Sequence, residues 1–144
     1  MKIALIGYGK MGKAIEEVIL EQKKHEIVSV SYKDIGSGLD LGGIARADIA
    51  IDFTSAEIIL STIKTIMSLK KPMVVGTTGW YDKMPQVERL VKKYKGSLIY
   101  GQNFSIGANI FFSIISYASL LIGKYVDYDV FGIETHHTGK KDSP

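Results

Sequence analysis

Short runs rich in isoleucine and valine alternate with longer helical stretches along most of this chain, and this alternation limits the possible folds more than any other feature. Five such runs predict buried strands, at residues 2–6, 26–31, 48–53, 72–75 and 97–101. Because parallel strands are joined by helical crossovers, the pattern predicts an α/β fold with a Rossmann-type, doubly wound parallel sheet covered on both faces. Ligands of such sheets bind outside the carboxyl ends of the strands.

Helical segments are predicted between these strands, at about residues 10–22, 54–69 and 85–95. The middle segment opens on Thr54-Ser55-Ala56-Glu57, which has the spacing of a capping box. In such a box the first side chain accepts a backbone N–H and the last reaches back to the start. Residues 34–43 carry four glycines and few apolar side chains, which predicts a surface loop.

The composition narrows the function classes. A length of 144 residues suits one domain, or one and part of a second, and 46% apolar residues with only 3 prolines exclude disordered, collagen-like and coiled-coil classes. No cysteine is present, which excludes disulfide scaffolds and cysteine nucleophiles and favours a reducing cytoplasm. A net charge of +3 without long basic runs does not demand nucleic acid and favours small anions such as dinucleotides or dicarboxylates. The four apolar residues before the first glycine are too few for a signal peptide, so we expect no export.

Residues 106–123 contain no charged side chain and approach the length of a membrane-spanning helix. Asn109, Ser113 and Ser116 recur at helical spacing on one side, opposite an apolar stripe. This pattern predicts a helix buried in a core or an interface, with no membrane span. Residues 128–136 then alternate like a strand and lead into a polar tail.

The first predicted strand ends in the turn Gly7-Tyr8-Gly9-Lys10-Met11-Gly12, which opens the first helix. In this strand–turn–helix setting, G-x-G-x-x-G indicates dinucleotide binding. The glycines allow a tight turn, a close approach to a pyrophosphate and close packing of helix on strand, while the helix N-terminus offers free N–H donors. The alternative is a glycine-rich turn without a ligand.

The second strand is followed by Tyr32-Lys33-Asp34, where the adenine ribose of a dinucleotide would lie. Lys33 could meet the extra phosphate of NADP, or it could be a solvated loop lysine. The predicted cofactor is therefore NADPH or NADH.

Two later strand ends carry candidate contacts for the nicotinamide half. Gly76-Thr77-Thr78-Gly79 offers a close backbone approach and two hydroxyls that could bond a ribose or an amide. Gly101-Gln102-Asn103-Phe104 offers a side-chain amide and an aromatic face. A plain polar turn and a core phenylalanine are the respective alternatives.

The densest group of reactive side chains runs from Glu134 to Asp142 and contains His136, His137 and Lys140. Histidine exchanges a proton near neutral pH, and lysine can hold a carboxylate or polarise a carbon–nitrogen double bond. The group therefore suits an anionic substrate that gains a hydride and a proton. A zinc site is the rival, but adjacent histidines on an extended segment point to opposite faces, so we expect no metal. A charged surface loop is the other alternative.

The motifs, taken in order, resemble the dihydrodipicolinate reductase family, formally the 4-hydroxy-tetrahydrodipicolinate reductases. They are the first glycine turn, Asp52-Phe53-Thr54, residues 76–79, Asn103-Phe104-Ser105-Ile106-Gly107, and the E-x-H-H-x-x-K-x-D-x-P run that ends at Pro144. The resemblance implies reduction of 4-hydroxy-tetrahydrodipicolinate, a small dicarboxylate, to tetrahydrodipicolinate by NADPH or NADH. This is a step toward diaminopimelate and lysine in bacteria and plants.

Site roles follow from the resemblance by position. His136 is implied as the proton donor or acceptor, Lys140 as its partner, and His137 as a contact of a substrate carboxylate. The implied cofactor contacts are Gly7, Tyr8, Gly9, Lys10, Met11, Gly12, Lys33, Phe53, Gly76, Thr77, Thr78, Gly101, Gln102, Asn103 and Phe104. Many members carry an acidic residue on the adenine ribose where this chain has Tyr32 or Lys33, which weakens the case for strict NADH use.

The resemblance also implies the domain organisation. Residues 1–104 would be the dinucleotide-binding domain and residues 105–144 the start of an α+β substrate-binding and oligomerisation domain. In the family that domain continues past Pro144 with Ser-Gly-Thr and with the mixed sheet through which members form tetramers, so we expect a homo-oligomer. Two other functions stay open: a nucleotide-binding module without turnover, and another Rossmann oxidoreductase acting on a small acid. A chain of this length is also expected to expose the apolar face of residues 106–123 and to self-associate.

Overall fold

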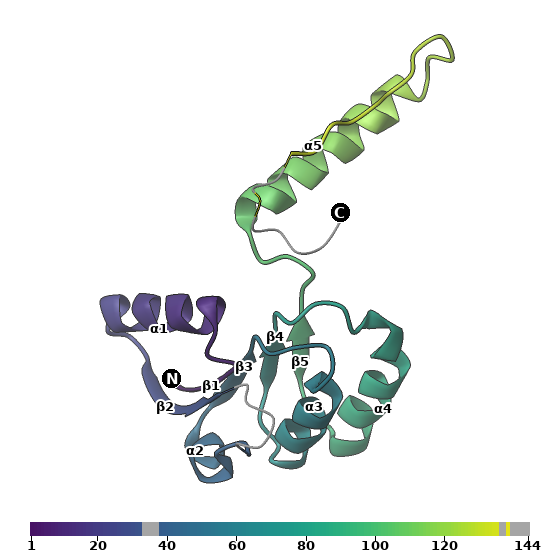
Figure 1. Ribbon diagram of the computed structural model, residues 1–144. Helices are drawn as coiled ribbons and strands as arrows, with labels where there is room; N and C mark the ends of the chain where they lie inside the picture. The colour runs from purple at the N-terminus through teal and green to yellow at the C-terminus, as the bar shows by residue number, and fades with distance from the viewer. Residues whose placement is uncertain (33–37, 136–137, 139–144) are drawn as a thin grey trace. The chain divides into compact units, whose positions relative to one another are not determined.

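The computed structural model describes residues 1–32, 38–135 and 138 (Figure 1). Contacts between Cα atoms divide the chain into two compact units, Met1–Phe104 and Ser105–Pro144. The sheet and the helices that cover it all lie in the first unit.

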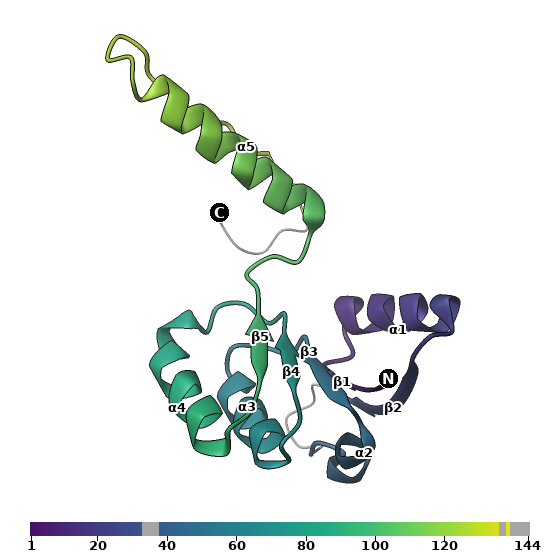
Figure 2. The ribbon, with the colours of Figure 1, turned by 180° about the vertical axis from the view of Figure 1, so that it is seen from behind.

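A five-stranded sheet forms the centre of the first unit, as Figures 1 and 2 show from opposite sides. The strands are β1 (Lys2–Ile6), β2 (Glu26–Ser31), β3 (Ile49–Asp52), β4 (Met73–Val75) and β5 (Leu98–Tyr100). Their order is β2-β1-β3-β4-β5, and every neighbouring pair is parallel. The predicted Rossmann-type α/β class is confirmed. Because the chain moves from β1 to β2 on one side and to β3 on the other, the switch point that binds ligands in such sheets lies between β1 and β3.

Helices cover the two faces of this sheet unequally. On one face, Ile19 of α1 (Lys10–Gln22) packs on Ile3 and Leu5 of β1. The larger core lies on the other face, beneath α2 (Leu41–Arg46), α3 (Ile59–Ser68), η1 (Tyr81–Lys83) and α4 (Met84–Tyr94). Ile99 of β5 remains 65% exposed on the α1 side, so the prediction of a sheet covered on both faces holds only in part for the described residues.

Helix α1 buries only part of its apolar side chains. Ile19 is buried and Ile15 packs beside it, but Met11 and Val18 are about half exposed. Gly12 is the buried residue of the first helical turn, and a Cβ there would collide with the carbonyl oxygen of Gly7. Because Gly12 has no side chain, the backbone of the first helical turn packs directly against the turn that follows β1.

Of the surface loop that the sequence predicts over residues 34–43, positions 34–37 lie outside the described residues, and α2 begins at Leu41. The carboxylate of Asp40 accepts a hydrogen bond from the backbone N–H of Gly43 at 2.9 Å and so caps the helix. Ile44 in the next turn is fully buried. Capping and burial thus outweigh the poor helix propensity of Gly42 and Gly43.

The predicted capping box at residues 54–57 is wrong. Helix α3 begins at Ile59, and no side chain caps it. The Thr54 hydroxyl donates instead to the carboxylate of Asp52, at 3.0 and 3.1 Å. The Thr54 side chain therefore bonds to the carboxylate two residues earlier and does not accept from the N–H groups at the start of the helix.

The second unit contains α5 (Ile106–Ile122), which Ser105 caps by accepting from the N–H of Ala108 at 3.3 Å. No residue of α5 is buried, so the predicted burial in a core is not found in the described part of the chain. The strand predicted at residues 128–136 does not form over residues 128–135, where no described strand pairs with it. None of the described helices combines the length and the apolar character that crossing a bilayer requires.

Candidate functional site

Turns that follow β1, β3, β4 and β5 meet at the carboxyl edge of the sheet, because all strands are parallel. Most of the predicted cofactor contacts lie in these turns. The first turn supplies the residues from Gly7 to Gly12, the second Phe53, the third Gly76, Thr77 and Thr78, and the fourth the residues from Gly101 to Phe104. The backbone has therefore brought together segments up to about a hundred positions apart in the sequence.

The structure explains in different ways why glycine stands at each of the three positions of the first turn. Gly7 has φ +87°, and a Cβ there would collide with the backbone carbonyl of Phe53. Gly12 is held against the Gly7 carbonyl in the same way. The packing of the protein itself therefore explains the first and the third glycine.

Gly9 differs, because apart from its neighbours in the chain no described residue has an atom within 4 Å of where its Cβ would be. It is the N-cap of α1, and neither a capping side chain nor an acidic residue of the first turn meets the helix N-terminus. Unpaired N–H groups and the positive end of the helix dipole thus face open space beside Gly9. This combination suits a phosphate group.

Tyr8 borders this turn and is fixed by its neighbours. Its hydroxyl donates to the Glu16 carboxylate, and this hydrogen bond is the main reason why the pKa of Tyr8 is raised. Its ring meets the ring of Tyr32 edge to face at 5.3 Å, and the Lys13 ammonium lies 5.8 Å from the ring centroid. Tyr8 is thus positioned by side chains from α1 and from the end of β2.

Phe53 follows β3 and joins two of the turns. Its carbonyl lies against Gly7, and its ring lies where a Cβ of Gly76 would be. Its backbone N–H donates to the carbonyl of Ile6 at 2.8 Å, which continues the ladder between β3 and β1. Glycines at positions 7 and 76 thus let three turns approach one another closely.

A buried carboxylate lies beneath these turns and was not among the predicted site residues. Asp52, the last residue of β3, has no exposed surface, and burial raises the pKa of its carboxyl. The hydroxyl of Thr77 donates to Asp52 Oδ1 at 2.6 Å and accepts from the N–H of Thr54 at 2.7 Å. One feature of the sequence could have pointed to Asp52: it directly follows the apolar run Ile49-Ala50-Ile51, and a residue at the end of a buried strand is not expected to be solvated.

Because of this network, Thr77 and Thr78 of the third turn have different surroundings. The side chain of Thr77 is buried and its hydroxyl is used by Asp52 and Thr54, so it does not face a ligand site. The carbonyl of Thr77 accepts from the indole N–H of Trp80 at 2.6 Å. Thr78, by contrast, is exposed. Of the two hydroxyls predicted to meet a ligand, that of Thr77 is bonded within the protein, whereas Thr78 lies at the surface.

The fourth turn leaves its side chains at the surface. Gln102, Asn103 and Phe104 are exposed, and the Phe104 ring is 49% exposed and packs over Gly101. The alternative of Phe104 as a core residue is therefore wrong for the described chain. The remaining predicted residues, Lys33, His136, His137 and Lys140, lie outside the described residues.

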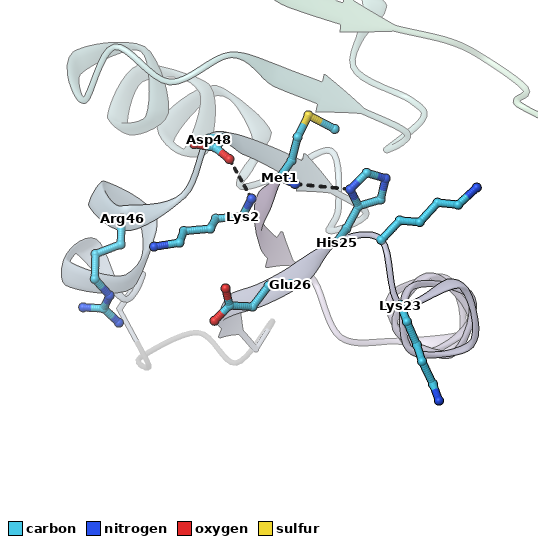
Figure 3. Close-up of a pocket in the computed structure, with 8 residues that line it drawn as sticks. Met1, Lys2, Lys23, His25, Glu26, Arg46 and Asp48 are labelled. Carbon is cyan, nitrogen blue, oxygen red and sulfur yellow. Dashed lines mark hydrogen bonds between the residues drawn. The ribbon is translucent and has the colours of Figure 1, made fainter.

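A separate pocket of about 610 Å³ opens at the amino ends of the strands (Figure 3). It is lined mainly by charged groups, among them Lys2, Arg46 and Asp48. The backbone N–H of Lys2 donates to the Asp48 carboxylate at 2.7 Å, and the amine of Met1 lies 3.3 Å from the ring of His25. It lies at the opposite ends of the strands from the glycine turns. Nowhere among the described residues, this pocket included, do three His, Cys, Asp or Glu side chains gather as a metal site would require.

Comparisons with known proteins agree with this geometry. Residues 1–104 match the family model for dihydrodipicolinate reductase, N-terminus. The 4-hydroxy-tetrahydrodipicolinate reductase of Christiangramia forsetii is 39% identical over 144 residues, which are 100% of this chain and 59% of that protein. The enzyme of the same name from Zymomonas mobilis is 34% identical over 149 residues, or 57% of its length. The chain spans about three fifths of the length of these curated relatives.

Solved structures share the fold. A dipicolinate-bound dihydrodipicolinate reductase from Paenisporosarcina sp. TG-14 aligns with a TM-score of 0.67 at 24% identity, over 83% of this chain and 53% of that one. A homoserine dehydrogenase from S. aureus aligns with a TM-score of 0.54 at 19% identity, over 72% of this chain and 32% of that one. Since the family model covers well over half of its residues, this chain belongs to the dihydrodipicolinate reductase family.

Proposed function

We propose that this chain is the nucleotide-binding part of a reductase that converts 4-hydroxy-tetrahydrodipicolinate to tetrahydrodipicolinate with NADPH or NADH. The observation that carries the proposal is the space beside Gly9, where the uncapped N-terminus of α1 meets the switch point of the sheet. A pyrophosphate there would accept hydrogen bonds from the free N–H groups of the first helical turn. The family to which residues 1–104 belong supports the same reading.

The residues of the carboxyl edge fit the other parts of a dinucleotide. Thr78 offers an exposed hydroxyl, and Phe104 an exposed aromatic face, for the nicotinamide half. We assign the 2′-phosphate of NADPH to Lys33 as a prediction, since Tyr32 beside it carries no charge that would repel a phosphate. The cofactor, when bound, supplies the hydride, and the protein supplies position and electrostatics.

For the substrate half we retain the predictions made from the resemblance. His136 would exchange the proton at a ring nitrogen, Lys140 would assist it, and His137 would hold a carboxylate of the substrate. Residues 105–144 would then belong to the substrate-binding domain. We further propose that the protein acts in the cytoplasm as a homo-oligomer, a tetramer at full length.

Gly9→Ala tests the cofactor site without disturbing the packing. A methyl group at Gly9 meets no described atom and its φ of −84° suits alanine, so we expect an intact fold. It would, however, occupy the space proposed for the pyrophosphate, and we expect the Kd for NADPH, measured by calorimetry, to rise at least about tenfold. Gly42→Ala is the matched control, since it adds the same methyl on α2, outside the proposed site, with only ordinary contacts. Equal affinity of the two variants and the unaltered chain would refute the proposed site.

A nucleotide-binding module without turnover is the second candidate. It is favoured by the location of every described residue of the candidate site within one compact unit, Met1–Phe104. The reductase and the module are separated by following the absorbance of NADPH with freshly prepared 4-hydroxy-tetrahydrodipicolinate, beside the calorimetric binding experiment. Binding with turnover supports the reductase, and binding without turnover supports the module. Turnover that persists in His136→Ala and Lys140→Ala would favour an oxidoreductase acting on another small acid.

A further inference from the structure

We propose that Asp52 is a positioning residue for the nicotinamide half of the cofactor site: its buried carboxylate holds Thr54 and Thr77 and so fixes the turns after β3 and β4 relative to each other. The inference rests on the proposed function, since it assumes that these turns bind a nicotinamide cofactor. Asp52 itself has no exposed surface and would not touch the ligand.

The geometry shows how one carboxylate reaches both turns. Asp52 Oδ1 accepts from the Thr77 hydroxyl at 2.6 Å, from the Thr54 hydroxyl at 3.0 Å and from the Thr54 N–H at 3.2 Å. Asp52 Oδ2 accepts from the Thr54 hydroxyl at 3.1 Å. The Thr77 hydroxyl in turn accepts from the Thr54 N–H at 2.7 Å, which closes the network across the two turns.

The consequence is a third turn held from two sides. The Asp52 network fixes the side chain of Thr77, and the Trp80 indole fixes its carbonyl. Because Thr77 is held on both sides, the position of the next residue, the exposed Thr78, is set as well. Asp52 therefore determines where a ligand-facing group lies without contacting the ligand.

Stability alone does not account for a carboxylate at this position. Burying a carboxyl group costs free energy, and a well-packed apolar side chain would normally be as favourable. The other strand-end residues beside Asp52 in the sheet, Ile6 and Val75, are apolar and buried. Titratable groups buried in this way gather at functional sites, which agrees with a role in ordering the turns.

The test compares two ligands that differ only in the nicotinamide. In the proposed site the nicotinamide amide of NADPH meets the turn at Thr78, whereas 2′-phospho-ADP-ribose, which keeps both riboses but lacks the nicotinamide, makes no contact that depends on this turn. We expect Asp52→Ala and Thr77→Val each to raise the calorimetric Kd for NADPH about tenfold, the size expected for loss of a charge-assisted hydrogen bond. The Kd for 2′-phospho-ADP-ribose should change by less than about twofold.

Three controls identify the mechanism. The double variant Asp52→Ala/Thr77→Val should lose no more NADPH affinity than either single variant, because both remove the same network. Thr77→Ser, which keeps the hydroxyl, should restore binding. Thr62→Val removes an equally buried threonine hydroxyl, bonded to the Ile58 carbonyl at 3.1 Å in α3, and should leave the ratio of the two Kd values unchanged.

Each outcome decides the inference. If the unaltered chain binds neither ligand, the proposed function fails and the inference falls with it. If the unaltered chain binds both and the variants weaken both equally, as Thr62→Val would through stability, only the positioning role is overturned. If Asp52→Ala does not fold, the selectivity of Thr77→Val and its rescue by serine carry the same decision.

Discussion

The ionisation of Asp52 should be visible in the stability of the chain. Burial raises the pKa of this carboxyl above its value of 3.8 in the unfolded chain. A raised pKa in the folded state means that the protonated form is favoured there. The contribution of Asp52 to stability is therefore fully present below the unfolded pKa and is lost as the pH rises through the folded pKa.

We predict that Asp52→Asn removes this part of the pH dependence. The asparagine amide can still accept from Thr77 and donate to the Thr54 hydroxyl, so the network can persist. Urea unfolding from pH 4 to pH 8 should show the unaltered chain losing stability relative to the variant as the pH rises from about 4. Other groups titrate equally in both proteins, so parallel curves would show that Asp52 is not shifted in the predicted direction.

At the level of single residues, the sequence was most informative where only one residue type is physically possible at a position. Gly7 and Gly12 are held by backbone contacts that only glycine allows, as the motif predicted. The two adjacent threonines of the third turn, in contrast, look equivalent in the sequence. Only the position of Asp52 across the sheet separates the buried Thr77 from the exposed Thr78. That pairing joins residues 25 positions apart and leaves no local signal.

Among the elements, all five strands were predictable, because each is a short apolar run flanked by polar or glycine-rich turns. Helix α2 could not be predicted from its glycine-rich sequence, because it is stabilised by the Asp40 cap and by the burial of Ile44 against the rest of the fold. The capping box before α3 failed because the Thr54 hydroxyl has a stronger acceptor in Asp52. Such competition between a local signal and a tertiary partner is where single-sequence reasoning is weakest.

The two glycines of α2 offer a matched prediction of opposite sign. A Cβ at Gly42 makes only ordinary contacts, so Gly42→Ala should raise the free energy of unfolding by about 0.5–1 kcal/mol through helix propensity. A Cβ at Gly43 would collide with the Asp40 carboxylate and with Ser29, so Gly43→Ala should lower it by about 1–3 kcal/mol. Urea titration of both variants measures the two values; a shift of the same sign in both would contradict the described packing of α2 on β2.

At the scale of the molecule, the two units differ in how they treat apolar residues. The first unit packs apolar residues, among them Ile3, Ile19 and Ile63, into two clusters on either side of the sheet. In the second unit α5 exposes apolar side chains on all sides, among them Ile110, Phe111 and Ile114. An exposed apolar surface of this kind marks an interaction site or an aggregation risk. The sequence predicted an apolar helix here correctly, but within the described part of the chain no residue of α5 is buried.

We therefore predict that the 144-residue chain self-associates through α5. Sedimentation velocity at increasing concentration should show species larger than the 15.9 kDa monomer. The double variant Ile110→Gln/Ile114→Gln should shift this equilibrium toward the monomer, because it removes two large side chains from the exposed apolar surface of α5. Leu20→Gln is the matched control, since Leu20 is similarly exposed but lies on α1. A monomer at every concentration, or an equal response to the control, would mean that the exposed face of α5 does not drive association.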